Sequence, residues 1–112
     1  MISGPDVPVG EKAVTSLAFA LHEPATNAAK YGALSASNGA IRIKWVVQGG
    51  GVHFEWEETG GPVIAAAPQA GGFGSVLTER SITGQLGGKI EYDWRRNGLK
   101  LMMKVPLDRL GV

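Results

Sequence analysis

Apolar residues recur every three or four positions between residues 11 and 34, and this spacing predicts a helix that follows an opening loop over 1–10. The predicted buried stripe of this helix consists of Val14, Leu17, Leu21 and Ala25. Pro24 conflicts with a regular helix, because a proline in a helix interior removes a backbone hydrogen bond and costs roughly 3 kcal/mol. We therefore expect either a kink near Pro24 or two successive helices that meet there.

Four later segments alternate between apolar and polar residues, which is typical of half-buried strands. The first two, over 40–47 and 52–58, flank the glycine turn QGGG and form a predicted hairpin. The last two, over 89–94 and 99–105, are joined through Asn97-Gly98, a dipeptide that strongly favours a hairpin turn.

A long glycine-rich loop over 59–75 separates the two hairpins, and loops of this length in compact domains are usually functional or disordered. A second helix is predicted from Ser75 to Leu86, with Ser75 as its N-cap and Gly87-Gly88 as its end. The order helix, hairpin, loop, helix, hairpin favours an α+β fold. We expect a two-layer sandwich in which helices cover one face of a largely antiparallel sheet.

The composition narrows the function classes. A chain of 112 residues with 44% hydrophobic residues and a net charge of +1 is expected to form a single globular domain without the basic face that nucleic-acid binding needs. The absence of cysteine excludes disulfides and thiolate metal sites. No apolar run is long enough to span a bilayer. We expect a cytoplasmic domain that contacts neither nucleic acid nor a membrane.

The stretch LHEPATNAAKYGAL places several chemically useful side chains on one helix face, because residues three or four apart are neighbours on a helix. Glu23, Asn27, Lys30 and Tyr31 follow this spacing. An amide oxygen can ligate Mg²⁺, an ammonium can neutralise phosphate, and a carboxylate can accept a proton. The alternative is an ordinary solvated helix face.

Two further stretches could contact a nucleotide. In WEETGGP, over 56–62, an acid enters a Gly-Gly turn, where it could accept from an exocyclic amine while the glycines let a planar ring approach. In GGFGS, over 71–75, bare backbone amides precede a helix and could hold phosphate. The alternatives are a strand end with turn glycines and a flexible linker with an N-cap. No Walker-type lysine follows the glycines, which excludes a P-loop.

Taken in order, these motifs resemble the ATP-binding catalytic domain of the HWE family of bacterial histidine kinases, a branch of the GHKL superfamily. That family is named after a histidine in its N box and a Trp-x-Glu in its G1 box, which correspond here to His22 and to Trp56 with Glu58. The resemblance extends from about Gly4 to Leu107. It implies the Bergerat fold, a sandwich with a mixed, mostly antiparallel sheet.

The resemblance also implies roles for individual residues. Asn27 would hold the Mg²⁺ that bridges the phosphates of ATP, and Glu23 would act as general base or organise water. Lys30 and Tyr31 would flank the phosphates. Glu58, where most relatives carry aspartate, would accept from the adenine amino group. The other implied nucleotide contacts are His22, Trp56, Gly60 and Gly61 near the base, and Gly72, Phe73, Gly74 and Ser75 near the phosphates, with 63–71 as a shortened lid.

The implied function is the ATP·Mg²⁺-binding catalytic domain of a two-component histidine kinase. Its γ-phosphate would pass to a histidine on a separate dimerisation domain and then to a response regulator. No phosphoacceptor domain accompanies residues 1–112, so we expect an N-terminally truncated single domain that does not autophosphorylate alone. Pro24 stands where the family usually has an apolar helix former such as leucine, which leaves open a degenerate, non-catalytic nucleotide-binding or phosphotransfer docking module. A globular domain without a ligand is the remaining alternative.

Overall fold

A five-stranded sheet forms one layer of the molecule, in a computed structural model that describes residues 2–62 and 78–111. Its strand order is β1-β2-β3-β5-β4. The strands are β1 (Ile2–Ser3), β2 (Ala40–Gln48), β3 (Gly51–Thr59), β4 (Lys89–Arg95) and β5 (Gly98–Pro106). β1 runs parallel to β2, and the remaining neighbours are antiparallel.

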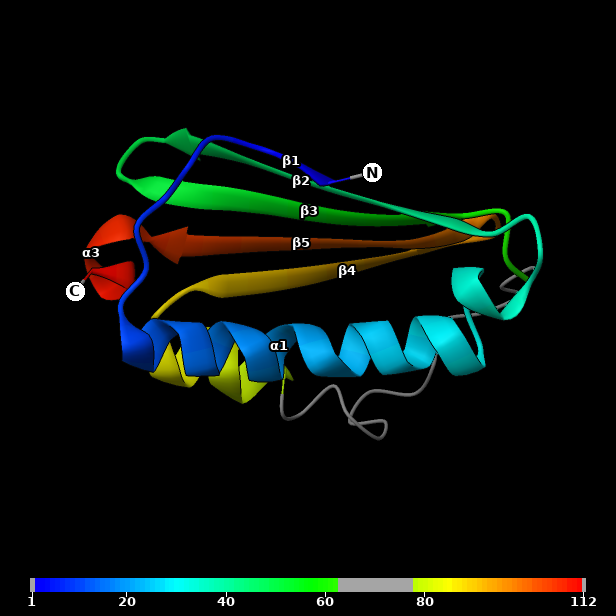
Figure 1. The fold of residues 1–112 in the computed structure, drawn as a ribbon, viewed down its shortest axis with the longest axis horizontal. Helices are drawn as coiled ribbons and strands as arrows, with labels where there is room; N and C mark the ends of the chain where they lie inside the picture. The colour runs from blue at the N-terminus through cyan, green and yellow to red at the C-terminus, as the bar shows by residue number, and fades with distance from the viewer. Residues whose placement is uncertain (1, 63–77, 112) are drawn as a thin grey trace.

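The helices form the second layer, on one face of the sheet (Figure 1). They are α1 (Glu11–Lys30), the 3₁₀ turn η1 (Ala33–Ser35), the π-helical segment η2 (Arg80–Gln85) and the short α3 (Leu107–Leu110). A sheet covered by helices on one face confirms the predicted α+β two-layer sandwich. None of the helices within the described ranges combines the length and the hydrophobicity needed to cross a membrane.

Both predicted hairpins are present, as β2–β3 and β4–β5. The first turns through Gly49 and Gly50, whose φ angles of 59° and 76° lie in the left-handed region that favours glycine. The opening loop over 1–10 was only partly right, because Ile2–Ser3 pairs with β2. A strand of two residues has no periodicity of its own, so it depends on its pairing partner.

The predicted buried stripe of α1 was partly wrong. Val14 is 52% exposed and Ala25 is exposed, while Leu17 and Leu21 are half-buried. The fully buried positions are smaller residues: Ala13, Ala20, Pro24 and Ala28. The physical reason is that α1 packs against η2 as well as the sheet, which turns its buried stripe towards η2.

Pro24 lies inside a single helix, which excludes the second of the two expected alternatives, a division into two successive helices. Figure 1 shows α1 running the length of the sheet without a visible break. Since Pro24 has no N–H, it cannot bond the carbonyl of Ala20 as position 24 of a regular helix would. The hydroxyl of Thr78 donates to this carbonyl instead, at 3.2 Å.

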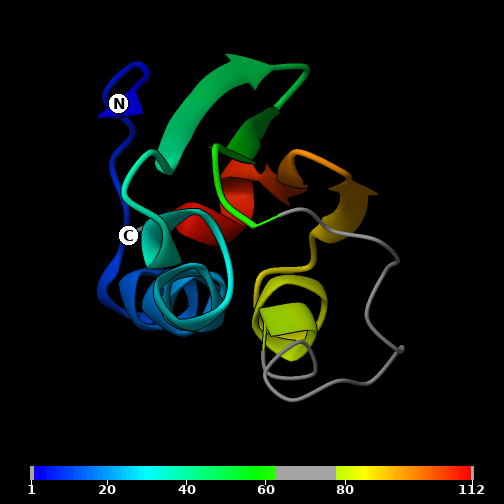
Figure 2. The same ribbon diagram turned by 90° about the vertical axis from the view of Figure 1, so that its right-hand side faces the viewer.

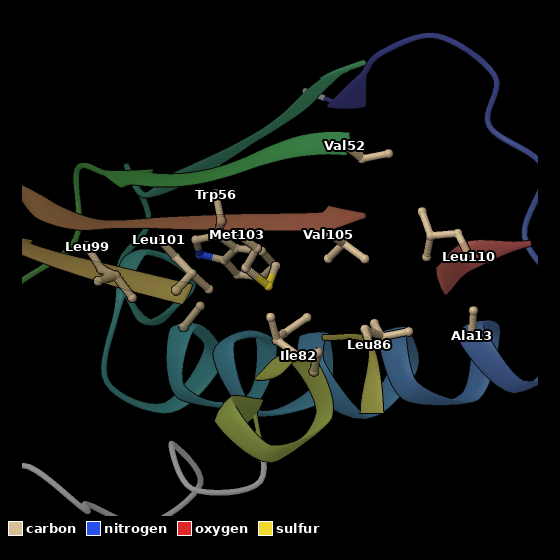
Figure 3. Close-up of a cluster of buried hydrophobic side chains, with 12 residues drawn as sticks. Ala13, Val52, Trp56, Ile82, Leu86, Leu99, Leu101, Met103, Val105 and Leu110 are labelled. Carbon is tan, nitrogen blue, oxygen red and sulfur yellow. The ribbon is translucent and has the colours of Figure 1, made fainter. Parts of the chain in front are cut away.

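The core lies between the two layers, with side chains from β3 and β5 facing Ile82 and Leu86 around η2 (Figure 3). Trp56 is 4% exposed and pairs in register with Leu101, which is fully buried. Tyr92 of β4 also faces this layer. Burial, with a contribution from the nearby Glu79 carboxylate, raises the pKa of Tyr92 to about 12, so its phenol stays uncharged at neutral pH.

Candidate functional site

Several of the predicted site residues lie towards one end of the molecule, where α1 ends, η1 follows and β3 reaches its last residue. Figure 2 views this end, with α1 and η2 side by side below the sheet and the segment after β3 descending towards them. The side-by-side arrangement agrees with the bond between Thr78 and Ala20.

Glu58 is the most constrained acid of this region, with only 6% of its surface exposed. Its Oε2 accepts from the indole Nε1 of Trp56, and its Oε1 accepts from the backbone N–H of Ala33, both at 3.0 Å. Trp56 and Glu58 point to the same face of β3 because they are two residues apart on a strand. The Trp-x-Glu spacing thus lets the tryptophan orient the carboxylate towards the helical layer.

Glycines allow β3 and the end of α1 to approach this closely. A Cβ on Gly32 would collide with Oε1 of Glu58, and a Cβ on Gly61 would lie 2.7 Å from the Cα of Ala33. Gly60 also requires glycine, because its φ of 74° lies in the left-handed region. Gly60 and Gly61 therefore have a packing role in addition to any contact with a ligand.

Glu23 and Asn27 lie on the flank of α1 that faces η2. They follow Ala20 at the i+3 and i+7 positions, which share one helix face, and Ala20 marks that face through its bond to Thr78. Both side chains are half-buried. Among the residues that the structure describes, none forms a hydrogen bond or ion pair with the side chain of either, so both remain available to a ligand.

Asn27 and Glu58 are connected through two successive backbone amides. The backbone carbonyl of Asn27 accepts from Gly32 N–H at 3.0 Å, and the backbone N–H of the next residue, Ala33, donates to the Glu58 carboxylate. The metal-ligand candidate and the buried acid therefore belong to one compact region at the end of α1. Their chemistry combines a neutral oxygen donor, an oriented carboxylate and a close-lying glycine backbone.

Comparison with known proteins identifies relatives of this chain. The blue-light-activated histidine kinase 1 of Erythrobacter litoralis is 40% identical over 107 residues, which cover 94% of this chain. The blue-light-activated histidine kinase of Brucella anthropi is 38% identical over 109 residues. The chain is a homologue of the blue-light-activated histidine kinases. It spans only 29% and 22% of the lengths of these two relatives. No protein-family model matches this chain.

Solved structures of other proteins share the fold of this chain. The histidine kinase domain of the Erythrobacter litoralis EL346 blue-light-activated histidine kinase superposes with a TM-score of 0.81 at 18% identity, covering 97% of this chain and 54% of that one. The catalytic domain of histidine kinase ThkA, in a nucleotide-free form, gives a TM-score of 0.68 at 20% identity, covering 94% and 76%. This chain therefore has the fold of a histidine kinase catalytic domain.

The other predicted site residues that the structure describes lie further from the end of α1 and Glu58 or are more exposed. Tyr31 is 74% exposed, and Lys30 and His22 are also exposed. His22 precedes Asn27 by five residues, which places it about 140° away around the helix. Gly72, Phe73, Gly74 and Ser75, the proposed lid over 63–71 and the start of the second helix at Ser75 lie outside the described residues.

The sequence patterns did not indicate three residues that contribute to this region: Gly32, Ala33 and Thr78. Gly32 and Ala33 lie within the quoted stretch around Asn27, and a glycine directly after a helix with polar side chains was the available signal. Ala33 contributes through its backbone, so its residue type carries no chemical signal. Thr78 contributes a hydroxyl whose partner is set only by the packing of η2 against α1.

An apolar cavity of about 370 Å³ lies towards the other end of α1. It is lined by residues such as Leu17, Leu21, Trp45 and Phe54, and within the described ranges Asp6 is the one charged residue of its lining. An aspartate and an apolar wall disfavour a triphosphate, so the charged part of a nucleotide is better matched by the region around Asn27.

Proposed function

We propose that this domain binds ATP with Mg²⁺ and transfers the γ-phosphate to a histidine that lies outside these 112 residues. The observation that carries the proposal is that Asn27 and Glu58 lie at the same end of α1, where Ala33 N–H donates to the Glu58 carboxylate and Gly32 N–H donates to the backbone carbonyl of Asn27. Homology to histidine kinases supports it independently. The HWE assignment within those kinases remains a prediction from His22 and the Trp-x-Glu motif.

The residues present fit a nucleotide with its metal. An ionised carboxylate has about four acceptor positions, and Glu58 uses two for Trp56 and Ala33, so it can accept a further bond from the adenine amino group. The backbone of Gly60 and Gly61, shortly after this acid, would lie against the base. The half-buried Asn27 amide oxygen is a hard donor of the kind that Mg²⁺ prefers.

Phosphoryl transfer depends mainly on positioning and charge neutralisation. ATP would supply the phosphoryl group and Mg²⁺ would offset its charge. Asn27 would hold the metal, and the exposed Lys30, one turn later, would neutralise phosphate oxygens together with the predicted amides of 72–75. Glu23, one turn before Asn27, would orient the incoming imidazole or accept its proton. Tyr31 and His22 would contact the nucleotide from the rim.

The proposed partners are a dimerisation domain with the phosphoacceptor histidine and, indirectly, a response regulator. One fold relative, histidine kinase ThkA, has been solved in complex with the response regulator TrrA, with a TM-score of 0.68 at 20% identity, covering 96% of this chain and 34% of that one. Because ATP is an intracellular substrate, we further propose that the domain works in the cytoplasm.

The rival function is a docking module that binds nucleotide without transferring phosphate. Pro24 was the sequence feature that left it open, because a kink at this position would displace Glu23 relative to Asn27. The single helix through Pro24 preserves the one-turn spacing of these residues and supports the catalytic proposal.

A chimera separates the two functions. The chimera is the blue-light-activated histidine kinase 1 of Erythrobacter litoralis with its 107 matched residues replaced by this domain. We expect this chimera to become labelled by γ-³²P-ATP and the same chimera with Asn27→Ala to remain unlabelled. A thermal-shift scan of the isolated domain with ATP, ADP and Mg²⁺ runs in parallel, because a ligand that binds the native state raises its apparent stability. Stabilisation without labelling would favour the docking module. The absence of both stabilisation and labelling would reject nucleotide binding.

A further inference from the structure

Thr78, two residues before η2, is joined to α1 by a hydrogen bond. Its hydroxyl donates to the carbonyl of Ala20 at 3.2 Å. Thr78 is 1% exposed and Ala20 is fully buried, so water does not replace either partner. A contact of this kind between two helices is directional, whereas apolar packing alone permits sliding.

Pro24 leaves the acceptor of this bond without its regular helical donor. In a regular α-helix the carbonyl of residue 20 accepts from the N–H of residue 24, and proline has no N–H. The carbonyl of Ala20 would thus be a buried acceptor without a helical donor. Thr78 supplies the missing donor from outside the helix, so the two departures from a regular pattern compensate each other.

The bond lies on the functional flank of α1. Ala20, Glu23 and Asn27 stand at i, i+3 and i+7, and therefore share the face that η2 approaches. Two residues after Thr78 the chain enters the π-helical η2, where Leu86 N–H bonds the carbonyl of Ser81, five residues back, at 3.2 Å. Single π-helical turns within helices are rare and frequently mark functional positions.

We propose that Thr78 is a positioning residue for the ATP site: with Pro24, it fixes η2 against the α1 flank that presents Glu23 and Asn27. This inference rests on the proposed function. The hydroxyl of Thr78 touches neither nucleotide nor metal in this account, and acts by setting the separation of the two helices beside the triphosphate. Pro24 is then part of the site's construction rather than a sign of degeneration.

The test compares Thr78→Val, which keeps the side-chain shape but removes the hydroxyl, with Thr78→Ser, which keeps the hydroxyl. We expect calorimetry to show Mg·ATP affinity about tenfold weaker in Thr78→Val and within about twofold of the unmodified domain in Thr78→Ser. Thr83→Val is the matched control, because the exposed Thr83 hydroxyl bonds the Glu79 carbonyl at 2.6 Å and, in the part of the chain that the structure describes, no residue of α1. It should leave affinity unchanged.

A stability cycle tests the link to Pro24 without any nucleotide. Pro24→Ala restores the N–H that the Ala20 carbonyl lacks, so Thr78→Val should lower the folding equilibrium constant about tenfold in the unmodified domain but less than threefold in the Pro24→Ala background. Equal losses in both backgrounds would overturn the compensation.

The two failures are distinguishable. If the unmodified domain binds Mg·ATP and Thr78→Val binds equally well, or Thr78→Ser loses as much affinity as Thr78→Val, the positioning role is wrong while the proposed function stands. If the unmodified domain binds no nucleotide, the proposed function fails and the positioning role fails with it.

Discussion

Asn27→Ala is expected to abolish Mg·ATP binding, with a loss of affinity of roughly a hundredfold or more by calorimetry. The substitution removes the one amide oxygen that the flank facing η2 offers to a metal, while the helix itself gains a residue of higher helix propensity. A loss of binding without a loss of stability would therefore report on the ligand and not on the fold. Asn27→Asp should also fail, because its added charge opposes the phosphates.

Asn38→Ala is the control for this experiment, because Asn38 is an exposed asparagine outside the helix. It should bind Mg·ATP as the unmodified domain does. Unchanged affinity in both Asn27 variants would rule out the metal role and would leave homology as the only support for catalysis.

Glu58→Ala is expected to destabilise the domain by about 2–4 kcal/mol and to abolish nucleotide binding. Truncation leaves the buried Trp56 Nε1–H and Ala33 N–H without an acceptor, and each unsatisfied donor costs about 1–3 kcal/mol. Glu58→Gln should have an intermediate effect on stability, since its single carbonyl oxygen cannot occupy both positions of the carboxylate. Urea unfolding measures the stability and calorimetry the binding.

Glu57→Gln provides the comparison on the same strand. Glu57 points to the opposite face of β3, where it lies 3.8 Å from Arg42 and 3.6 Å from Arg95 in partly exposed ion pairs. Such pairs contribute about 0–1 kcal/mol, so this variant should stay close to the unmodified domain in both measurements. A Glu58→Ala variant as stable as Glu57→Gln would contradict the buried role assigned to this carboxylate.

The strands and their pairing could be predicted because alternation and turn residues are local signals. Asn97-Gly98 and the QGGG turn fix which strands are neighbours along the chain. The buried stripe of α1 was harder, since Val14 and Ala25 fit the apolar spacing but the neighbours of the helix decide which side is covered. Alanine at 13, 20 and 28 carries little hydrophobic signal, although small residues allow close packing.

The site was predicted through side chains and missed where the backbone contributes. The Trp-x-Glu motif indicated Glu58, and the structure adds that Trp56 donates to it. The other donor, Ala33 N–H, exists only because Gly32 permits a close approach. Pro24 was read as a disruption, because the compensating hydroxyl of Thr78 lies far along the chain.

Backbone amide NMR shifts on titration with Mg²⁺ and a non-hydrolysable ATP analogue test the central claim most directly. We predict saturable shifts concentrated at Asn27, Gly32, Ala33 and Glu58, with little change at the far end of α1. Shifts confined to the apolar cavity around Leu17 and Trp45, or no saturable shifts at all, would contradict a nucleotide site at the end of α1.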